Sequence, residues 1–160
     1  MVYSLPFNFF GGKSKMKIRY SITKCLPWDE AALLYKEAGW FAPEEEDEKV
    51  MEILQKMFAG TFACCAAFTE KGELAGLMRA LSDGISDAYI LDLVVKKEFR
   101  KQGIGHTILR HLTEDLSAKG IDWIVCIGVP GTESFYKNGG GKKMLSFTPY
   151  RFAEEKKEGE

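Results

Sequence analysis

The segment best suited to chemistry covers residues 91–105 (LDLVVKKEFRKQGIG), where an apolar strand is followed by a glycine-containing turn and a helix. Backbone N–H groups at a helix start lack partners within the helix, and the helix dipole adds partial positive charge there. Gly103 and Gly105 would let an anion approach the backbone, and Arg100 and Lys101 add full charges. This combination suits a diphosphate. The same glycines could instead serve only close packing of strand on helix.

Two better-known phosphate-binding patterns are excluded by their spacing. The dinucleotide-binding fingerprint needs a third glycine where this chain has Ile108. Gly12-Lys13-Ser14 resembles the end of a P-loop, but the first glycine of that motif would fall on Phe7. The turn at residues 100–105 is therefore the candidate anion site that remains.

Asp92 is a second candidate for chemistry, because it interrupts a strand that otherwise looks buried on both faces. A carboxylate in such a place is costly unless it is hydrogen-bonded or faces a cavity. It could serve as a general base or bind a substrate amine. Equally, it could cap a bulge or pair with Arg79 on the adjacent strand, and the sequence leaves both interpretations open.

Hydrophobic periodicity predicts the elements that position these residues, in the order β-α-α-β-β-β-α-β-α-β. The predicted strands are 17–23, 61–69, 73–81, 87–95, 121–129 and 142–152, and the predicted helices are 29–38, 44–58, 103–119 and 132–138. Lys71-Gly72 and Asp83-Gly84 are hairpin signals, so the three strands of 61–95 form an antiparallel meander. The next strand–helix–strand unit predicts a parallel pair. The expected fold is α/β (α+β), a mixed sheet with an antiparallel first half and helices on both faces.

The composition indicates one ordinary globular domain. The chain has 160 residues, 46% hydrophobic and 28% charged, and we expect a folded domain over 16–153, a leader over 1–15 and a charged tail over 154–160. A net charge of −1 does not favour a nucleic-acid partner. The four cysteines lack metal-ligand spacing and indicate reduced thiols in a cytoplasmic protein without a metal site. No apolar run suggests a membrane span, and residues 1–10 lack the features of a secretory signal.

The pattern Arg100-x-x-Gly103-x-Gly105 after a valine-rich strand resembles motif A of the GNAT (GCN5-related N-acetyltransferase) superfamily. ELAGLMR at 73–79, Ser82-Asp83-Gly84 and Phe135-Tyr136 follow that family's order and spacing. Within the superfamily the chain looks most similar to a small single-domain branch that includes plant-type serotonin N-acetyltransferases. The resemblance covers about residues 17–152.

This resemblance implies an acyltransferase that moves an acetyl group from acetyl-CoA to a primary amine by direct attack in a ternary complex. Its diphosphate would be bound by main-chain amides of Arg100, Lys101, Gln102, Gly103, Ile104 and Gly105. His106 would either neighbour the diphosphate or face solvent. The strand ending at Val95 would splay from 121–129, and the pantetheine arm would lie along Leu93, Val94 and Val95. An N–H near Leu93 would polarise the thioester carbonyl.

By the same resemblance Tyr136 would protonate the leaving thiolate, and Asp92 is the first choice for the base. The alternative for Tyr136 is an aromatic residue on a helix surface. Trp40 and Phe41 fall where the family places its substrate-facing loop, although core packing would explain them equally well. Glu44–Glu48 could attract a cationic amine, but a solvated first helical turn is the simpler interpretation.

One departure from the family pattern supports a different function. Gly139–Gly141 replace the Leu, Gly and Phe that usually follow the Phe-Tyr pair, which removes packing behind Tyr136. The alternative is therefore a catalytically weakened acyl-CoA-binding or regulatory module of the same fold. Acetylation of aminoacyl-tRNA is a third possibility that the absence of net basic charge does not favour. By analogy with the family, we also expect a homodimer.

Overall fold

The structure is a computed structural model that describes residues 17–152. A five-stranded sheet has the order β1-β2-β3-β4-β5, with antiparallel pairs from β1 to β4 and a parallel pair β4-β5. Its strands are β1 (Ile18–Ile22), β2 (Ala63–Thr69), β3 (Leu74–Ser82), β4 (Asp87–Val95) and β5 (Trp123–Val125). The helices are α1 (Trp28–Glu37), α2 (Asp47–Ala59), α3 (Ile104–Ala118) and α4 (Glu133–Asn138), with a 3₁₀ turn at Lys97–Phe99. This confirms the predicted mixed sheet with its antiparallel first half.

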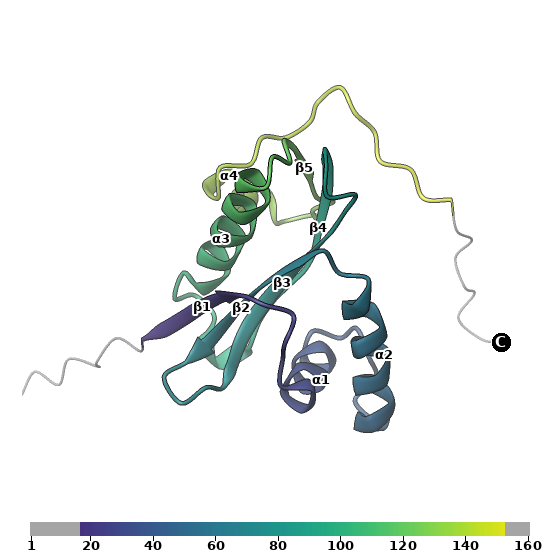
Figure 1. Ribbon diagram of the computed structural model, residues 1–160, viewed down its shortest axis with the longest axis vertical. Coiled ribbons are helices and arrows are strands. Elements are labelled where there is room, and N and C mark those ends of the chain that lie inside the picture. Colours follow the sequence, from purple (N-terminus) through teal and green to yellow (C-terminus); the bar gives the residue numbers. More distant parts are fainter. Residues whose placement is uncertain (1–16, 153–160) are drawn as a thin grey trace, which may run out of the picture.

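Helices cover both faces of the sheet, with α3 on one side and the α1–α2 pair on the other (Figure 1). Strand periodicity creates the two cores: Cys65 and Ala67 of β2 belong to the core under α3, and Cys64 and Ala66 to the core under α1 and α2. The α3 core is built on a stripe with a spacing of four residues, Ile104, Ile108, Leu112 and Leu116. Small side chains in β2 let both helical layers approach the sheet closely.

The largest differences from the sequence-based expectation concern α2, β5 and the residues after α4. Helix α2 begins at Asp47 instead of Glu44, because residues 43–46 form a turn in which Glu45 N–H donates to the Ala42 carbonyl at 3.1 Å. Strand β5 is limited to Trp123–Val125. The predicted strand over 142–152 is wrong: these residues form no helix or strand, and no described strand lies beside them. The predicted leader and tail lie outside the described residues.

Within residues 17–152, no helix is long and apolar enough to cross a membrane. The compartment in which the protein works stays a prediction.

Candidate active site

The central feature of the site is a strand edge without a partner. β5 pairs with β4 only at Asp87, Ala88 and Tyr89. From Ile90 to Val95, β4 continues with β3 on one side and no described strand on the other. The parallel pair therefore separates as predicted, and leaves backbone donors and acceptors of β4 for another extended group.

A β-bulge lies at the middle of this open edge. Arg79 pairs with Leu91 and Leu77 with Val94, so Asp92 and Leu93 together oppose the single residue Met78. Asp92 has φ 55°, a left-handed conformation that Asp tolerates better than most residues. Bulges of this kind redirect side chains and recur beside functional sites. Here the bulge turns Asp92 toward α1, while Leu93 packs against the α3 core.

The Asp92 carboxylate is held by an arginine and a tyrosine. Arg79 Nε donates to Asp92 Oδ2 at 2.5 Å, and Tyr35 Oη of α1 donates to the same oxygen at 3.2 Å. The Arg79 side chain is only 9% exposed, and that of Asp92 is 20% exposed. The sequence left two interpretations of Asp92 open, a functional carboxylate or a structural one that caps a bulge or pairs with Arg79. The structure shows both the bulge and the pair with Arg79. The role of Asp92 as a base stays a prediction.

Burial and the Asp92 charge together raise the pKa of the Tyr35 hydroxyl well above its usual value, so Tyr35 stays a hydrogen-bond donor at any physiological pH. Arg79 Nη1 also donates to Thr61 Oγ1 at 3.3 Å. The network therefore joins α1, β3 and β4 beneath the open strand edge.

Gly103 and Gly105 meet different physical demands in the turn. Gly103 caps α3 with φ 81°, and a Cβ built on it would meet no atom within 4 Å, so this side of the turn is open. Gly105 is enclosed: its Cβ would lie 3.4 Å from the Phe135 ring and 3.7 Å from Val95. Gly103 is therefore suited to the approach of an anion to the backbone, whereas Gly105 is suited to the alternative, close packing of strand on helix.

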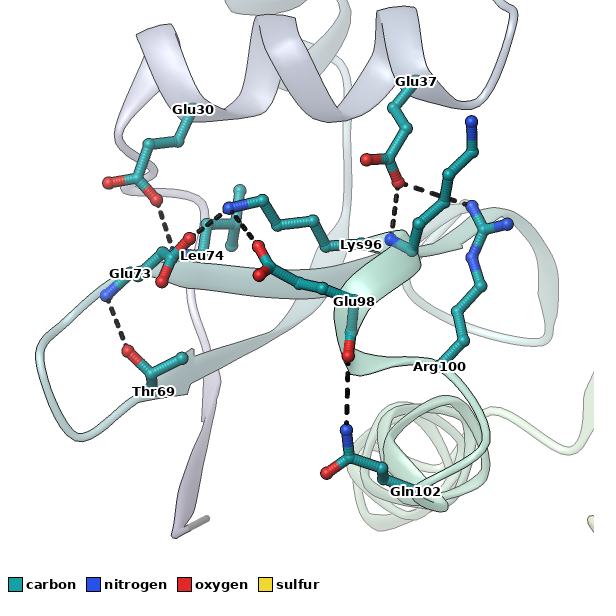
Figure 2. A network of polar contacts seen from close by, with 10 residues as sticks. Glu30, Glu37, Thr69, Glu73, Leu74, Lys96, Glu98, Arg100 and Gln102 are labelled. Atoms are coloured by element: carbon teal, nitrogen blue, oxygen red, sulfur yellow. Dashed lines mark hydrogen bonds and ion pairs between the residues drawn. The ribbon is translucent and has the colours of Figure 1, made fainter.

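Arg100 is engaged by its own protein. Its Nε donates to the Val95 carbonyl at 2.7 Å. Its Nη2 lies 3.5 Å from Glu37 Oε1 (Figure 2). The same Glu37 oxygen accepts the Lys97 N–H at 2.6 Å, so the end of α1 is fastened to the turn. The guanidinium would have to leave Glu37 before its charge could act fully on a bound diphosphate. Lys101 and Gln102 are exposed beside it.

Tyr136 lies half-buried where β4 and β5 separate. Its ring stands edge-on to Phe135 at 5.2 Å, and a Cβ on Gly128 would come within 3.2 Å of it. Its hydroxyl lies near the Cys126 thiol, just after β5. Burial, then the nearby thiol, raises the pKa of the Tyr136 hydroxyl, so it keeps its proton at neutral pH, as a general acid must. Tyr136 is therefore not a surface aromatic residue.

Two residues have contacts that sequence reasoning missed. His106 is half-buried, with Nε2 3.1 Å from the Phe135 carbonyl and its ring 4.2 Å from the Phe135 ring, so it joins α3 to α4. Its place beside a diphosphate stays a prediction. Cys126 lies beside Tyr136, and burial raises the pKa of its thiol. The sequence signal for Cys126 was only its place in an apolar strand, which is equally typical of a core thiol.

Trp40 and Phe41, between α1 and α2, could contact substrate or pack in the core, and the two residues differ in their surroundings. Phe41 is half-buried against the α1–α2 core, whereas Trp40 is 45% exposed, with its ring 4.9 Å from that of Tyr35. Because Tyr35 also donates to Asp92, a series of side-chain contacts connects the exposed Trp40 with the bulge through Tyr35. Of the acidic run, Glu44, Glu46, Asp47 and Glu48 are exposed and Glu45 is partly buried.

The family model for the "Acetyltransferase (GNAT) family" matches residues 28–139. The chain belongs to this family. The matched region contains the bulge, the turn and Tyr136, and it ends at the first residue of the glycine run.

Relatives of the GNAT domain include two plant proteins. GCN5-related N-acetyltransferase 1, chloroplastic, of Arabidopsis thaliana is 39% identical over 59 residues, or 37% of this chain and 30% of that protein. Serotonin N-acetyltransferase 2, chloroplastic, of Oryza sativa subsp. japonica is 29% identical over 72 residues, or 45% of this chain and 36% of that protein. The matches span about a third of each relative's length. They agree with the predicted resemblance to plant-type serotonin N-acetyltransferases, but both relatives are named as chloroplastic, not cytoplasmic.

Solved structures show the same fold. An acetyltransferase from Deinococcus radiodurans R1 superposes with a TM-score of 0.67 at 24% identity, covering 88% of this chain and 92% of that one. An aminoglycoside N-acetyltransferase in complex with CoA superposes with a TM-score of 0.65 at 14% identity, covering 88% and 97%.

Proposed function

We propose that this GNAT protein transfers an acetyl group from acetyl-CoA to a primary amine, by direct attack of the amine within a ternary complex. The observation that carries the proposal is the open β4 edge from Ile90 to Val95, bordered by the half-buried Tyr136. An extended amide-containing arm can pair with such an edge. A protonated, partly desolvated hydroxyl beside it suits a general acid.

The residues of the chain fit this cofactor. The open cradle at Gly103 and the N–H groups at the start of α3 would hold the diphosphate, with Lys101 beside them. Leu93, Val94 and Val95 would line the pantetheine arm. When bound, acetyl-CoA supplies the thioester that donates the acyl group.

The bulge and α4 would then supply the catalytic groups. The N–H of Leu93 would donate to the thioester carbonyl oxygen as negative charge develops there. Tyr136 Oη would hold the proton that the departing sulfur takes. The acceptor amine would arrive past Trp40, whose exposed ring can contact an apolar or aromatic part of it. The amine nitrogen loses a proton as the C–N bond forms, and the Asp92 carboxylate or a water molecule would accept it.

The direct test is acetyl transfer by the purified chain to a panel of amines, with release of the CoA thiol as the readout. The panel should include serotonin, because one plant relative is named for it. We expect Tyr136→Phe to lower kcat by about ten- to a thousandfold while the Kd for CoA stays nearly unchanged. Tyr150→Phe is the matched control, because Tyr150 is 77% exposed. An unchanged kcat in Tyr136→Phe would remove this residue from the acid role.

A catalytically weakened acyl-CoA-binding module is the second candidate, and the glycine run favours it. A Cβ on Gly139 would lie 2.7 Å from a Leu109 methyl, and one on Gly141 would lie 3.0 Å from the Tyr136 carbonyl. The chain after α4 therefore turns back tightly and places no side chain behind Tyr136. Calorimetry that detects CoA binding, together with no transfer to any amine in the panel, would favour this module over the enzyme.

A further inference from the structure

Tyr35 of α1 has a buried hydroxyl that the proposed reaction does not use. The residue is 1% exposed, and its ring lies in the core under α1 and α2, 4.9 Å from the Trp40 ring and 6.3 Å from the Phe41 ring. Phenylalanine would make the same ring contacts without a polar atom to satisfy. Because burying a hydroxyl is unfavourable unless it is hydrogen-bonded, its presence here needs a separate reason.

The hydroxyl of Tyr35 contacts the carboxylate at the centre of the β-bulge. Tyr35 Oη donates to Asp92 Oδ2 at 3.2 Å, although the two residues are 57 positions apart in the sequence. Arg79 Nε donates to the same oxygen at 2.5 Å. The two donors belong to different elements, α1 and β3, so together they tie the carboxylate to a helix and to the neighbouring strand.

The second donor, Arg79, is itself held in place. Its Nη1 donates to Thr61 Oγ1 at 3.3 Å, and Thr61 Oγ1 donates to the Met57 carbonyl at 3.2 Å. Its guanidinium carbon lies 5.9 Å from the centre of the Phe58 ring. A carboxylate bonded to a fixed, buried donor has little freedom of its own, so the Asp92 side chain can anchor the backbone to which it is attached.

The backbone of Asp92 needs such an anchor. Its φ of 55° is unfavourable for a residue with a Cβ, and a conformation of this kind persists only where the surrounding structure enforces it. The peptide that follows carries the Leu93 N–H, the group proposed to bind the thioester oxygen. Asp92 and Leu93 together oppose Met78, so relaxation of Asp92 toward ordinary strand geometry would rotate this peptide and redirect its N–H.

We propose that Tyr35 is a positioning residue for acetyl transfer: through its hydrogen bond to Asp92, it holds the bulge in the conformation that directs the Leu93 N–H at the thioester carbonyl. Tyr35 acts through Asp92 and does not touch the reacting atoms. This role rests on the proposed function, because it requires acetyl-CoA to lie along the open β4 edge. Since a misplacement of about 1 Å can lower a rate by about a hundredfold, a small relaxation of the bulge is enough to measure.

Tyr35→Phe tests this role, because it removes the hydroxyl and keeps the ring. The first readout is the infrared carbonyl band of acetyl-CoA, labelled with ¹³C at the acetyl carbonyl and bound to the full chain, since a hydrogen bond to the oxygen lowers its frequency. Wild type should lower the frequency relative to free acetyl-CoA, and Tyr35→Phe should lose about half of that shift or more. The second readout is transfer: kcat should fall by about ten- to a hundredfold, while the KM for acetyl-CoA and the Kd for CoA stay nearly unchanged.

Tyr20→Phe is the matched control. Tyr20 is a half-buried tyrosine of β1 whose ring stacks on His111 at 5.3 Å, on the α3 side of the sheet, so loss of its hydroxyl should change neither the band nor kcat. Thermal denaturation separates stability from positioning. Tyr35→Phe should fold with a Tm lower by about 3–6 °C, as expected for the loss of one hydrogen bond to a charged group, and both readouts are taken well below the Tm of every variant.

A carbonyl band in Tyr35→Phe equal to that of wild type would overturn the positioning role, even if kcat fell, because the hydroxyl would then act on the proton acceptor and not on the Leu93 N–H. Wild type that transfers acetyl but leaves the band of bound acetyl-CoA unshifted would also overturn it, without harm to the proposed function. The converse is a shifted band, reduced in Tyr35→Phe, in a protein that acetylates no amine. That result would support the role of Tyr35 and favour the binding module over the enzyme.

Discussion

Replacing Asp92 by Asn tests whether this residue stabilises the fold or acts as the base. Arg79 is buried, and its Nε donates to Asp92 Oδ2 at 2.5 Å. Removing one partner of a buried ion pair costs about 3–5 kcal/mol, because the other charge is left uncompensated. Asp92 is partly exposed and Asn keeps an acceptor oxygen, so we expect the lower end, about 3 kcal/mol. At about 2–4 °C per kcal/mol for a domain of this size, the Tm should fall by about 6–12 °C.

Thermal and urea denaturation followed by circular dichroism measure this loss. Glu114→Gln is the matched control, because it makes the same chemical change at an exposed position of α3 and should leave the Tm unchanged. In a double-mutant cycle with Arg79→Gln, the double variant should lose about 1–3 kcal/mol less than the sum of the two single variants. A variant Asp92→Asn with wild-type Tm and abolished acetyl transfer would refute this reasoning and make Asp92 the base.

Two further predictions concern charges near the ends of the site. Three backbone N–H groups, from Ile85, Ser86 and Asp87, donate to Asp83 and lower its pKa to about 2. The stability that Asp83 contributes should therefore be complete above about pH 4 and lost as the pH falls through 2. In urea titrations, the difference in free energy of unfolding between wild type and Asp83→Asn should disappear over that pH window. A difference that does not depend on pH would contradict the prediction. Glu37→Gln removes the carboxylate beside Arg100 but keeps an acceptor for the Lys97 N–H. Because Arg100 is then free to act on the diphosphate, calorimetry should show CoA binding about two- to fivefold more tightly, the size expected for a partly exposed ion pair. Glu30→Gln is the control: Glu30 is on the same helix but accepts the Leu74 N–H, so this variant should not change the Kd for CoA. Weaker CoA binding in Glu37→Gln would show that Glu37 supports the turn instead of competing for Arg100.

The parts of the fold that the sequence predicted are those with local signals. The four-residue spacing of Ile104, Ile108, Leu112 and Leu116 predicted α3, and the X-Gly pairs predicted the meander. The strand over 142–152 was wrong because alternation shows that a segment can form a strand but says nothing about a partner. The length of β5 was overestimated for the same reason, since residues 126–129 are apolar but have no strand beside them.

The candidate site was predictable where it depends on backbone conformation and uncertain where it depends on tertiary contacts. The turn with Gly103 could be located from its residue types alone. Arg79 was foreseen as a partner of Asp92 only as one of the alternatives left open. Tyr35 was not foreseen, because it comes from a helix 57 residues away in the sequence. The need for Gly76 was not visible either: a Cβ there would lie 2.6 Å from the Val94 carbonyl, so only glycine lets β3 lie this close to β4 beside the bulge.

Phe135 has a consequence for engineering. Its ring occupies the space that a side chain at position 105 would need and packs against Tyr136 of its own helix, and its carbonyl contacts His106. Helix α4, which carries the proposed acid Tyr136, is thus positioned by the turn proposed to bind the diphosphate, and neither can be redesigned independently of the other. A chimera that imports α4 from another acetyltransferase would need to import the matching residues at 105 and 106 as well, or the Tyr136 hydroxyl would be displaced from its place beside β4.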